Sequence, residues 1–121
     1  MLKIDKTGTN RVDISLSGQI DAEEMEQGLD ALIAESEGVT EGRMLYTITD
    51  FAMPTLGALG VEMRKMPALF GLLGKYDKCA VVTNVGWLRN AAVFEGWLIP
   101  GFVIKTFAMA EKDAAEAWLK G

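Results

Sequence analysis

Hydrophobic and polar side chains alternate near the start of the chain. Over residues 11–17, the apolar Val12, Ile14 and Leu16 are separated by polar residues. A period of two is typical of a strand with one buried face. Residues 2–6 form a second short apolar segment, and the TGTN sequence between the two is rich in residues that favour turns. The pattern predicts a β-hairpin.

Helical spacing of apolar residues begins after this hairpin. Asp21 is placed to cap a helix that ends near Gly38, and acidic residues fill its first turns near the positive end of the helix dipole. These residues are Glu23, Glu24 and Glu26. Residues 55–74, 87–99 and 112–119 are further predicted helices, and residues 44–49, 78–83 and 102–107 are predicted strands.

The predicted element order is ββαβαβαβα, in one domain that spans residues 1–121. No internal repeat or linker interrupts it. Alternating strands and helices predict an α/β fold, with a mixed central sheet and helices packed on it.

The helix predicted over residues 55–74 is apolar on two sides. At 100° per residue, one stripe is assigned to the core. This stripe comprises Leu56, Leu59, Met63, Met66, Phe70 and Leu73. The far side, which we expect to be exposed, combines Val61, Arg64, Lys65, Leu69, Leu72 and Lys75. Pro67 should kink or break the helix, because it lacks an N–H donor and clashes with the preceding turn.

The exposed side of this helix has three interpretations. It is an ordinary surface with scattered apolar residues, which are common in proteins. Alternatively, its basic residues meet the headgroups of an anionic membrane while its apolar residues enter the interface. A protein interface, with another protein or in a homodimer, fits the same composition.

An apolar ligand site is also predicted between the helices at residues 55–74 and 87–99. Its candidate lining is Phe51, Met53, Met63, Met66, Phe70, Trp87 and Phe94. Open α/β sheets bind ligands at the carboxyl ends of their strands. Methionine and aromatic side chains suit an adaptable apolar ligand such as a lipid or fatty acid. Packing in the core is the alternative role of Trp87.

Composition excludes several chemistries. The chain has no histidine, which excludes Ser-His and Cys-His catalysis and histidine metal sites. Its one cysteine, Cys79, cannot form an intrachain disulfide and is expected to be a small buried hydrophobe. We therefore predict no enzyme activity, metal or cofactor.

Charge bears on partners and on location. A net charge of −5 argues against nucleic acid as a partner. No uncharged apolar run approaches the roughly 20 residues needed to span a bilayer, and the first residues lack the features of a signal peptide. We expect a cytoplasmic protein, with peripheral membrane association left open.

The element order, together with "GQIDAEE" before the first helix, resembles the STAS domain, and in particular its SpoIIAA-like branch. The segment "YDKCAVVTNVGWLRNAAVFEGWLIPGFVIKTFAMAEKDAAEAWL" carries most of this resemblance. In that branch an AVV-type strand is followed by a Trp that opens a helix, a Pro, a strand that ends in Phe, and a final helix of EAxAWL type. These motifs form the fold and are not catalytic.

The resemblance also implies a regulatory site. In sigma-regulating members a strand ends in Asp, followed by Ser or Thr and Gly, and the hydroxyl is phosphorylated. Here Asp50 matches the aspartate, but Phe51 and Ala52 stand where the hydroxyl should be. Thr55 follows a proline and is better interpreted as a helix cap. The phosphorylation switch is therefore expected to be absent.

We expect from these observations a non-enzymatic STAS-like module that binds an apolar ligand or a membrane through its second and third helices. The alternative is a regulatory protein-interaction domain, related to anti-sigma factor antagonists, that lacks the phosphorylated serine.

Overall fold

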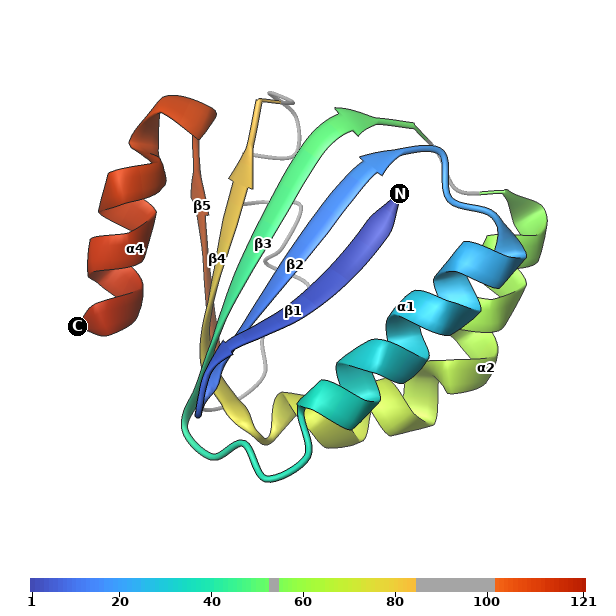
Figure 1. Cartoon of the computed structure of the whole chain (residues 1–121), viewed down its shortest axis with the longest axis horizontal. Helices are drawn as coiled ribbons and strands as arrows, with labels where there is room; N and C mark the ends of the chain where they lie inside the picture. The colour runs from blue at the N-terminus through green and yellow to red at the C-terminus, as the bar shows by residue number, and fades with distance from the viewer. Residues whose placement is uncertain (53–54, 85–101) are drawn as a thin grey trace.

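A five-stranded sheet organises the part of the chain that the structure describes, in the strand order β1-β2-β3-β4-β5 (Figure 1). The computed structural model describes residues 1–52, 55–84 and 102–121, except for the side chains of Phe51 and Leu73. The strands are β1 (Leu2–Gly8), β2 (Arg11–Gly18), β3 (Gly42–Phe51), β4 (Tyr76–Thr83) and β5 (Val103–Phe107). β1 and β2 pair antiparallel, and the other neighbouring strands pair in parallel. The predicted hairpin and mixed sheet are confirmed.

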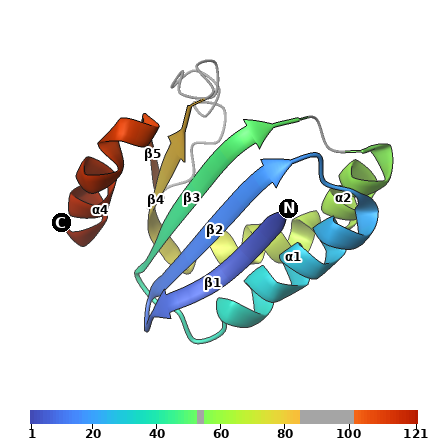
Figure 2. The same cartoon turned by 45° about the horizontal axis from the view of Figure 1, so that its top comes forward.

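Helices cover both faces of this sheet. The helical elements of the described residues are α1 (Ala22–Glu35), α2 (Leu56–Leu73), the short 3-10 helix η2 (Met109–Glu111) and α4 (Lys112–Lys120). α1 and α2 connect successive parallel strands by right-handed crossovers, which place both helices on one face. α4 lies on the opposite face (Figures 1 and 2). The third predicted helix, residues 87–99, lies outside the described residues.

Side-chain caps define where the first two helices begin. A carboxylate oxygen of Asp21 accepts a hydrogen bond from the backbone N–H of Glu24 at 2.9 Å, and the hydroxyl of Thr55 accepts one from Ala58 at 3.1 Å. Both predicted caps are confirmed. Pro67 does not break the helix, because α2 continues from Leu56 to Leu73, and a kink at Pro67 stays a prediction.

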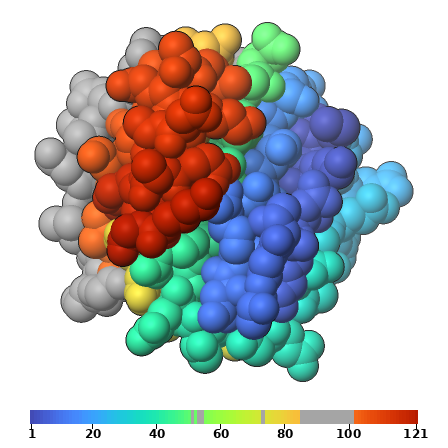
Figure 3. Space-filling view, turned by 60° about the vertical axis from the view of Figure 1, so that its left-hand side comes forward, coloured from blue at the N-terminus to red at the C-terminus, as the bar shows by residue number. Residues whose placement is uncertain are grey.

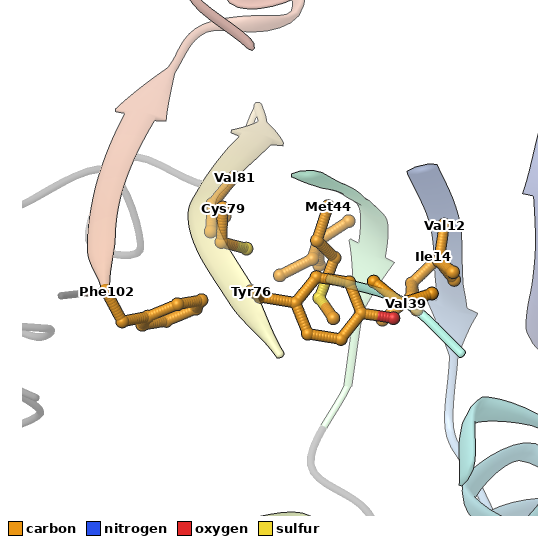
Figure 4. Packing of buried hydrophobic residues seen from close by; sticks show 9 residues of the cluster. Val12, Ile14, Val39, Met44, Tyr76, Cys79, Val81 and Phe102 are labelled. Atoms are coloured by element: carbon orange, nitrogen blue, oxygen red, sulfur yellow. The ribbon is translucent and has the colours of Figure 1, made fainter. Parts of the chain in front are cut away.

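The larger core lies on the face of the sheet that α1 and α2 cover. It contains Val12, Ile14, Val39, Met44, Ile48, Tyr76, Cys79, Val81 and Phe102, and all but Ile48 are labelled in Figure 4. The buried hydroxyls of Tyr76 and Ser36 are 2.6 Å apart and form a hydrogen bond, so neither is left unpaired on burial. Burial raises the pKa of the Cys79 thiol to about 12. Cys79 is therefore an unreactive core residue, as predicted.

A smaller core lies under α4. It comprises Leu45, Ala80, Val82, Phe107, Ala115 and Leu119. Figure 3 shows that α4 covers part of this sheet face and leaves side chains of β1 and β2 exposed beside it.

Cationic side chains from the sheet hold α4 in place. Arg11 donates two hydrogen bonds to the carboxylate of Glu116, at 3.0 and 2.9 Å, and a third to Asp13 at 2.6 Å. At the end of the helix, Arg43 donates to the carbonyl of Leu119 at 2.9 Å. Such cations stabilise the negative end of a helix dipole. The short helix thus depends on contacts with β2 and β3.

The Arg11–Glu116 pair predicts a pH-dependent contribution to stability. The hydrogen bond from Arg11 lowers the pKa of Glu116 in the folded protein. The carboxylate therefore stabilises the fold fully above its unfolded pKa of about 4.3, and this contribution is lost as the pH falls through the lower, folded value. Glu116→Gln should lower the free energy of unfolding by about 1 kcal/mol at pH 7.

Urea denaturation at several pH values measures this effect. The difference between the original chain and Glu116→Gln should shrink toward zero as the pH falls below about 4. Asp5→Asn, an exposed change on β1, is the control. A difference that stays constant with pH would show that the ion pair does not cause it.

Two helical glycines predict opposite effects of the same substitution. A Cβ on Gly28 of α1 would lie 2.3 Å from Leu2 Cδ2, whereas a Cβ on Gly60 of α2 would meet nothing within 4 Å. Gly28→Ala should therefore destabilise the fold by about 1–3 kcal/mol through overpacking. Gly60→Ala should stabilise it by about 0.5–1 kcal/mol, since alanine favours a helix. Thermal unfolding of both variants tests this, and stabilisation by Gly28→Ala would contradict the close contact between α1 and β1.

Candidate functional site

The buried side of α2 is formed by small and medium side chains. Ala58 is 0% exposed, Val61 4% and Leu72 7%, and the first two pack with Ile20 and Met25. The prediction that Val61 and Leu72 lie at the surface is therefore wrong. The reason is close packing of α2 against α1, because short side chains allow two helices to approach each other.

Contacts at two levels show how α1 and α2 lie together. A Cβ on Gly57 would be 3.2 Å from the Cβ of Ala22, at the beginning of both helices. Eight residues further along each helix, Lys65 Nζ lies 2.6 Å from a carboxylate oxygen of Asp30. The two helices therefore run parallel and side by side, as Figure 2 also shows.

The opposite side of α2 exposes large apolar side chains. Leu56 is 87% exposed, Met63 73% and Phe70 54%. At 100° per residue, these three lie within about 40° of one another, so they form one line along the helix. We call Leu56, Met63 and Phe70 the apolar ridge. Their predicted place in the core is wrong, because the side of α2 that carries Ala58 and Val61 faces α1 and the sheet.

Few charges interrupt this side of the helix. Besides the ridge, the exposed positions of α2 are Gly57, Gly60, Arg64, Pro67, Ala68 and Gly71. Of the charged residues in the described part of α2, Arg64 is thus the one whose side chain is exposed. By contrast, the exposed positions of α1 are Glu23, Glu26, Gln27, Asp30 and Ala34. The two neighbouring helices present chemically different surfaces.

The other residues predicted for a membrane or partner surface differ in their surroundings. Lys65 is ion-paired with Asp30, and its side chain is only 22% exposed. Leu69 and Lys75 are half-buried. With Val61 and Leu72 buried, the predicted mixture of basic and apolar residues does not form one exposed surface.

The residues predicted to line an apolar ligand site are described only in part. Met63 and Phe70 lie on the ridge, and Met66 is half-buried. Of Phe51 only the backbone is described, at the end of β3. Met53, Trp87 and Phe94 lie outside the described residues, so the ligand site stays a prediction.

Part of the segment that resembles a phosphorylation site has a structural role. Thr55 caps α2 with its hydroxyl, and its backbone N–H donates to the carbonyl of Ile20 at 3.0 Å. Asp50 is exposed, with a φ of 47°, a conformation that Asp tolerates better than most residues. It lies where the pairing of β2 with β3 becomes irregular, beside Gly18. The absence of the switch itself stays a prediction.

Buried ionisable groups of the sheet are poorly suited to chemistry. Burial raises the pKa of the Tyr46 hydroxyl well above its usual range, and that of Cys79 to about 12. In residues 1–52, 55–84 and 102–121, no group of three or more Cys, Asp or Glu side chains is arranged to hold a metal ion.

Comparison with known proteins identifies the family of this fold. A family model described as SpoIIAA-like matches residues 11–120. The chain belongs to the SpoIIAA-like family. The resemblance predicted from the sequence is thereby confirmed, and with it the α/β fold of this family.

A solved structure supports the same fold. It is the crystal structure of an uncharacterized protein of the DUF3478 family, with a SpoIIAA-like fold, from Shewanella loihica. The two chains are 20% identical and superpose with a TM-score of 0.73, over 98% of this chain and 92% of the other. No curated protein matches the chain. In the described part of the chain, no helix has the length and apolar character that crossing a membrane requires.

Because α2 buries the side that was predicted to be exposed, two similar substitutions should differ in their effect on the free energy of unfolding. Leu72→Ser removes a buried side chain and should lower the free energy of unfolding by about 2–4 kcal/mol. Leu56→Ser alters an exposed side chain and should change it by no more than about 0.5 kcal/mol. Urea denaturation of both variants measures the difference, and equal effects would contradict the described orientation of the helix.

Proposed function

We propose that this SpoIIAA-like chain is a non-catalytic binding module that docks a protein partner through the apolar ridge of α2. The observation that carries this proposal is the exposure of Leu56, Met63 and Phe70 in one line. Single exposed hydrophobic residues are normal in proteins. Three large ones on the same side of one helix, with a single charged neighbour on that side, are characteristic of an interaction site.

The dimensions of the ridge suit a helical or extended protein segment. From residue 56 to residue 70 a helix rises about 21 Å, at 1.5 Å per residue. A segment of that length can place apolar side chains against all three ridge residues, as in helix-in-groove recognition.

Charge favours a protein over an anionic membrane. Residues 1–50 carry 11 acidic and 4 basic side chains, and Glu23, Glu26 and Asp30 are exposed on α1, the helix that packs against α2. An anionic membrane that approached α2 would be repelled by these carboxylates. Of the basic residues predicted to attract it, Lys65 is already paired with Asp30.

The family comparison is compatible with this role. The resemblance to anti-sigma factor antagonists implies partner docking, and Phe51 and Ala52 stand in place of the phosphorylated residue. Docking in this chain is then independent of phosphorylation at that position.

A neutral amphipathic peptide tests the proposal. The probe is an 18-residue helix with leucine on one side and glutamine on the other, added to the ¹⁵N-labelled chain. Amide chemical-shift changes should concentrate on α2, and Met63→Ser with Phe70→Ser should weaken binding at least about tenfold, through the loss of apolar contact. Val103→Ser is the matched control, because Val103 is 55% exposed but lies on β5.

Two results would contradict the proposal. One is a set of shift changes that ignores α2, or that Val103→Ser reduces as much as the ridge variant does. The other is flotation of the chain with phosphatidylcholine or phosphatidylserine vesicles that depends on Met63 and Phe70, without peptide binding. That result would favour the membrane interpretation.

A further inference from the structure

We infer that two copies of the chain join through the outer edge of β1, so that their two sheets become one continuous sheet. β1 is the first strand in the sheet order, and in the part of the chain that the structure describes it pairs on one side only, with β2. In Figure 1 it lies in front of the other strands, and no described helix passes in front of it. The inference is independent of the proposed function, because it uses β1 and not the apolar ridge.

The main-chain groups at alternate positions of β1 point away from β2. The N–H of Ser17 donates to the carbonyl of Met1 at 2.8 Å, and the nitrogen of Met1 donates to the carbonyl of Ser17, so these two residues form a hydrogen-bonded pair. Hydrogen-bonded and non-hydrogen-bonded pairs alternate along an antiparallel ladder. The residues of β1 whose N–H and C=O groups point outward are therefore Leu2, Ile4 and Lys6. Such an edge is a template for another strand.

Side chains of opposite charge lie on the exposed face of β1. Lys3 and Asp5 are 61% and 54% exposed, and Lys3 Nζ lies 3.7 Å from a carboxylate oxygen of Asp5. On the other face of the strand, Leu2 and Ile4 pack against the larger core. The edge therefore offers a neighbouring strand two charges on one face and apolar side chains on the other.

The charges select one antiparallel register with a second copy. When Ile4 of each copy lies on the two-fold axis, Lys3 is opposite Asp5 of the second copy, and Asp5 is opposite its Lys3. Both are non-hydrogen-bonded pairs, in which the side chains of two strands approach most closely. A register centred on Lys3 or on Asp5 would instead place like charges opposite each other, which destabilises a strand pair.

The same register provides partners for the outward main-chain groups. Ile4 pairs with Ile4 of the second copy, and Leu2 of each copy pairs with Lys6 of the other. Three hydrogen-bonded pairs with two bonds each give about six main-chain hydrogen bonds. The irregularity between Lys6 and Gly8 ends the regular edge. Because the contact is two-fold symmetric, it closes at a dimer.

Sedimentation equilibrium of the full chain tests the association. At low salt, concentrations from about 10 μM to 1 mM should span an equilibrium between monomer and dimer. Lys3→Asp and Asp5→Lys each turn both cross-strand pairs into like-charge pairs, and each should weaken dimerisation at least about tenfold. Lys105→Asp makes the same charge change as Lys3→Asp on β5, at the other end of the strand order, and is the matched control.

Restoring the complementary charges should restore the dimer. Lys3→Asp with Asp5→Lys again places opposite charges across the two-fold axis, so the double variant should dimerise as the original chain does. An equimolar mixture of the two single variants should form a heterodimer, because one is acidic at both positions and the other is basic at both. Circular dichroism and urea denaturation check that each variant is folded.

Amide hydrogen exchange, measured by NMR, locates the strand pairing. At about 1 mM, the outward N–H groups of Ile4 and Lys6 should exchange more slowly in the original chain than in Lys3→Asp, because the dimer hydrogen-bonds them. The double variant should regain this protection.

Three results would overturn the inference. One is a chain that stays monomeric up to about 1 mM. Another is a dimer that Lys3→Asp weakens no more than Lys105→Asp does. The third is a dimer in which the amides of Ile4 and Lys6 stay unprotected, and dissociation of that dimer by Met63→Ser with Phe70→Ser would identify the apolar ridge as the contact.

Discussion

The close parallel packing of α1 against α2 is the constraint on which the surface of this protein depends. Ala22 and Gly57 lie together at one end, and the Asp30–Lys65 ion pair lies further along. This packing requires short side chains on the shared side of α2, and Ala58 and Val61 meet that requirement. Larger methionine and phenylalanine side chains would separate the helices, so they lie on the opposite side, in solvent.

The same packing gives the two helices different roles. The sheet and its larger core need cover on one face, and α1 and α2 provide it together (Figures 1 and 2). Their outer sides are then free to differ, one acidic and one apolar. An exposed apolar surface arises on the side of α2 away from α1 without any change to the core, which is how one fold can serve different partners.

The opposite face of the sheet is held together by other means. α4 is short, and ionic and hydrogen-bonding contacts from Arg11 and Arg43 supplement its small apolar core. Helices shorter than about 12 residues are marginal by themselves, so such tertiary contacts supply much of their stability. The two faces therefore combine a large apolar core on one side with a largely polar anchoring on the other.

Local sequence signals were sufficient for much of the architecture. The alternation in β2, the turn before it and the caps Asp21 and Thr55 act over a few residues, and each predicted its element correctly. The family motifs of the second half predicted the SpoIIAA-like fold, which the family model confirms. The substitution of Phe51 and Ala52 for a hydroxyl residue was also visible directly. These features depend on residue identity and short-range spacing.

The orientation of α2 was decided only by the tertiary structure. This helix is apolar on both sides, so periodicity alone could not distinguish the buried stripe, and the stripe with the largest residues was assigned to the core. The closeness of α1 selected the side with the smaller residues, and no pattern within α2 records that distance. The acids of α1 were readable in the sequence, but only as acids that favour a helix start. The ion pair of Asp30 with Lys65 depends on the packing of two segments about 35 residues apart, a relation that local spacing does not contain.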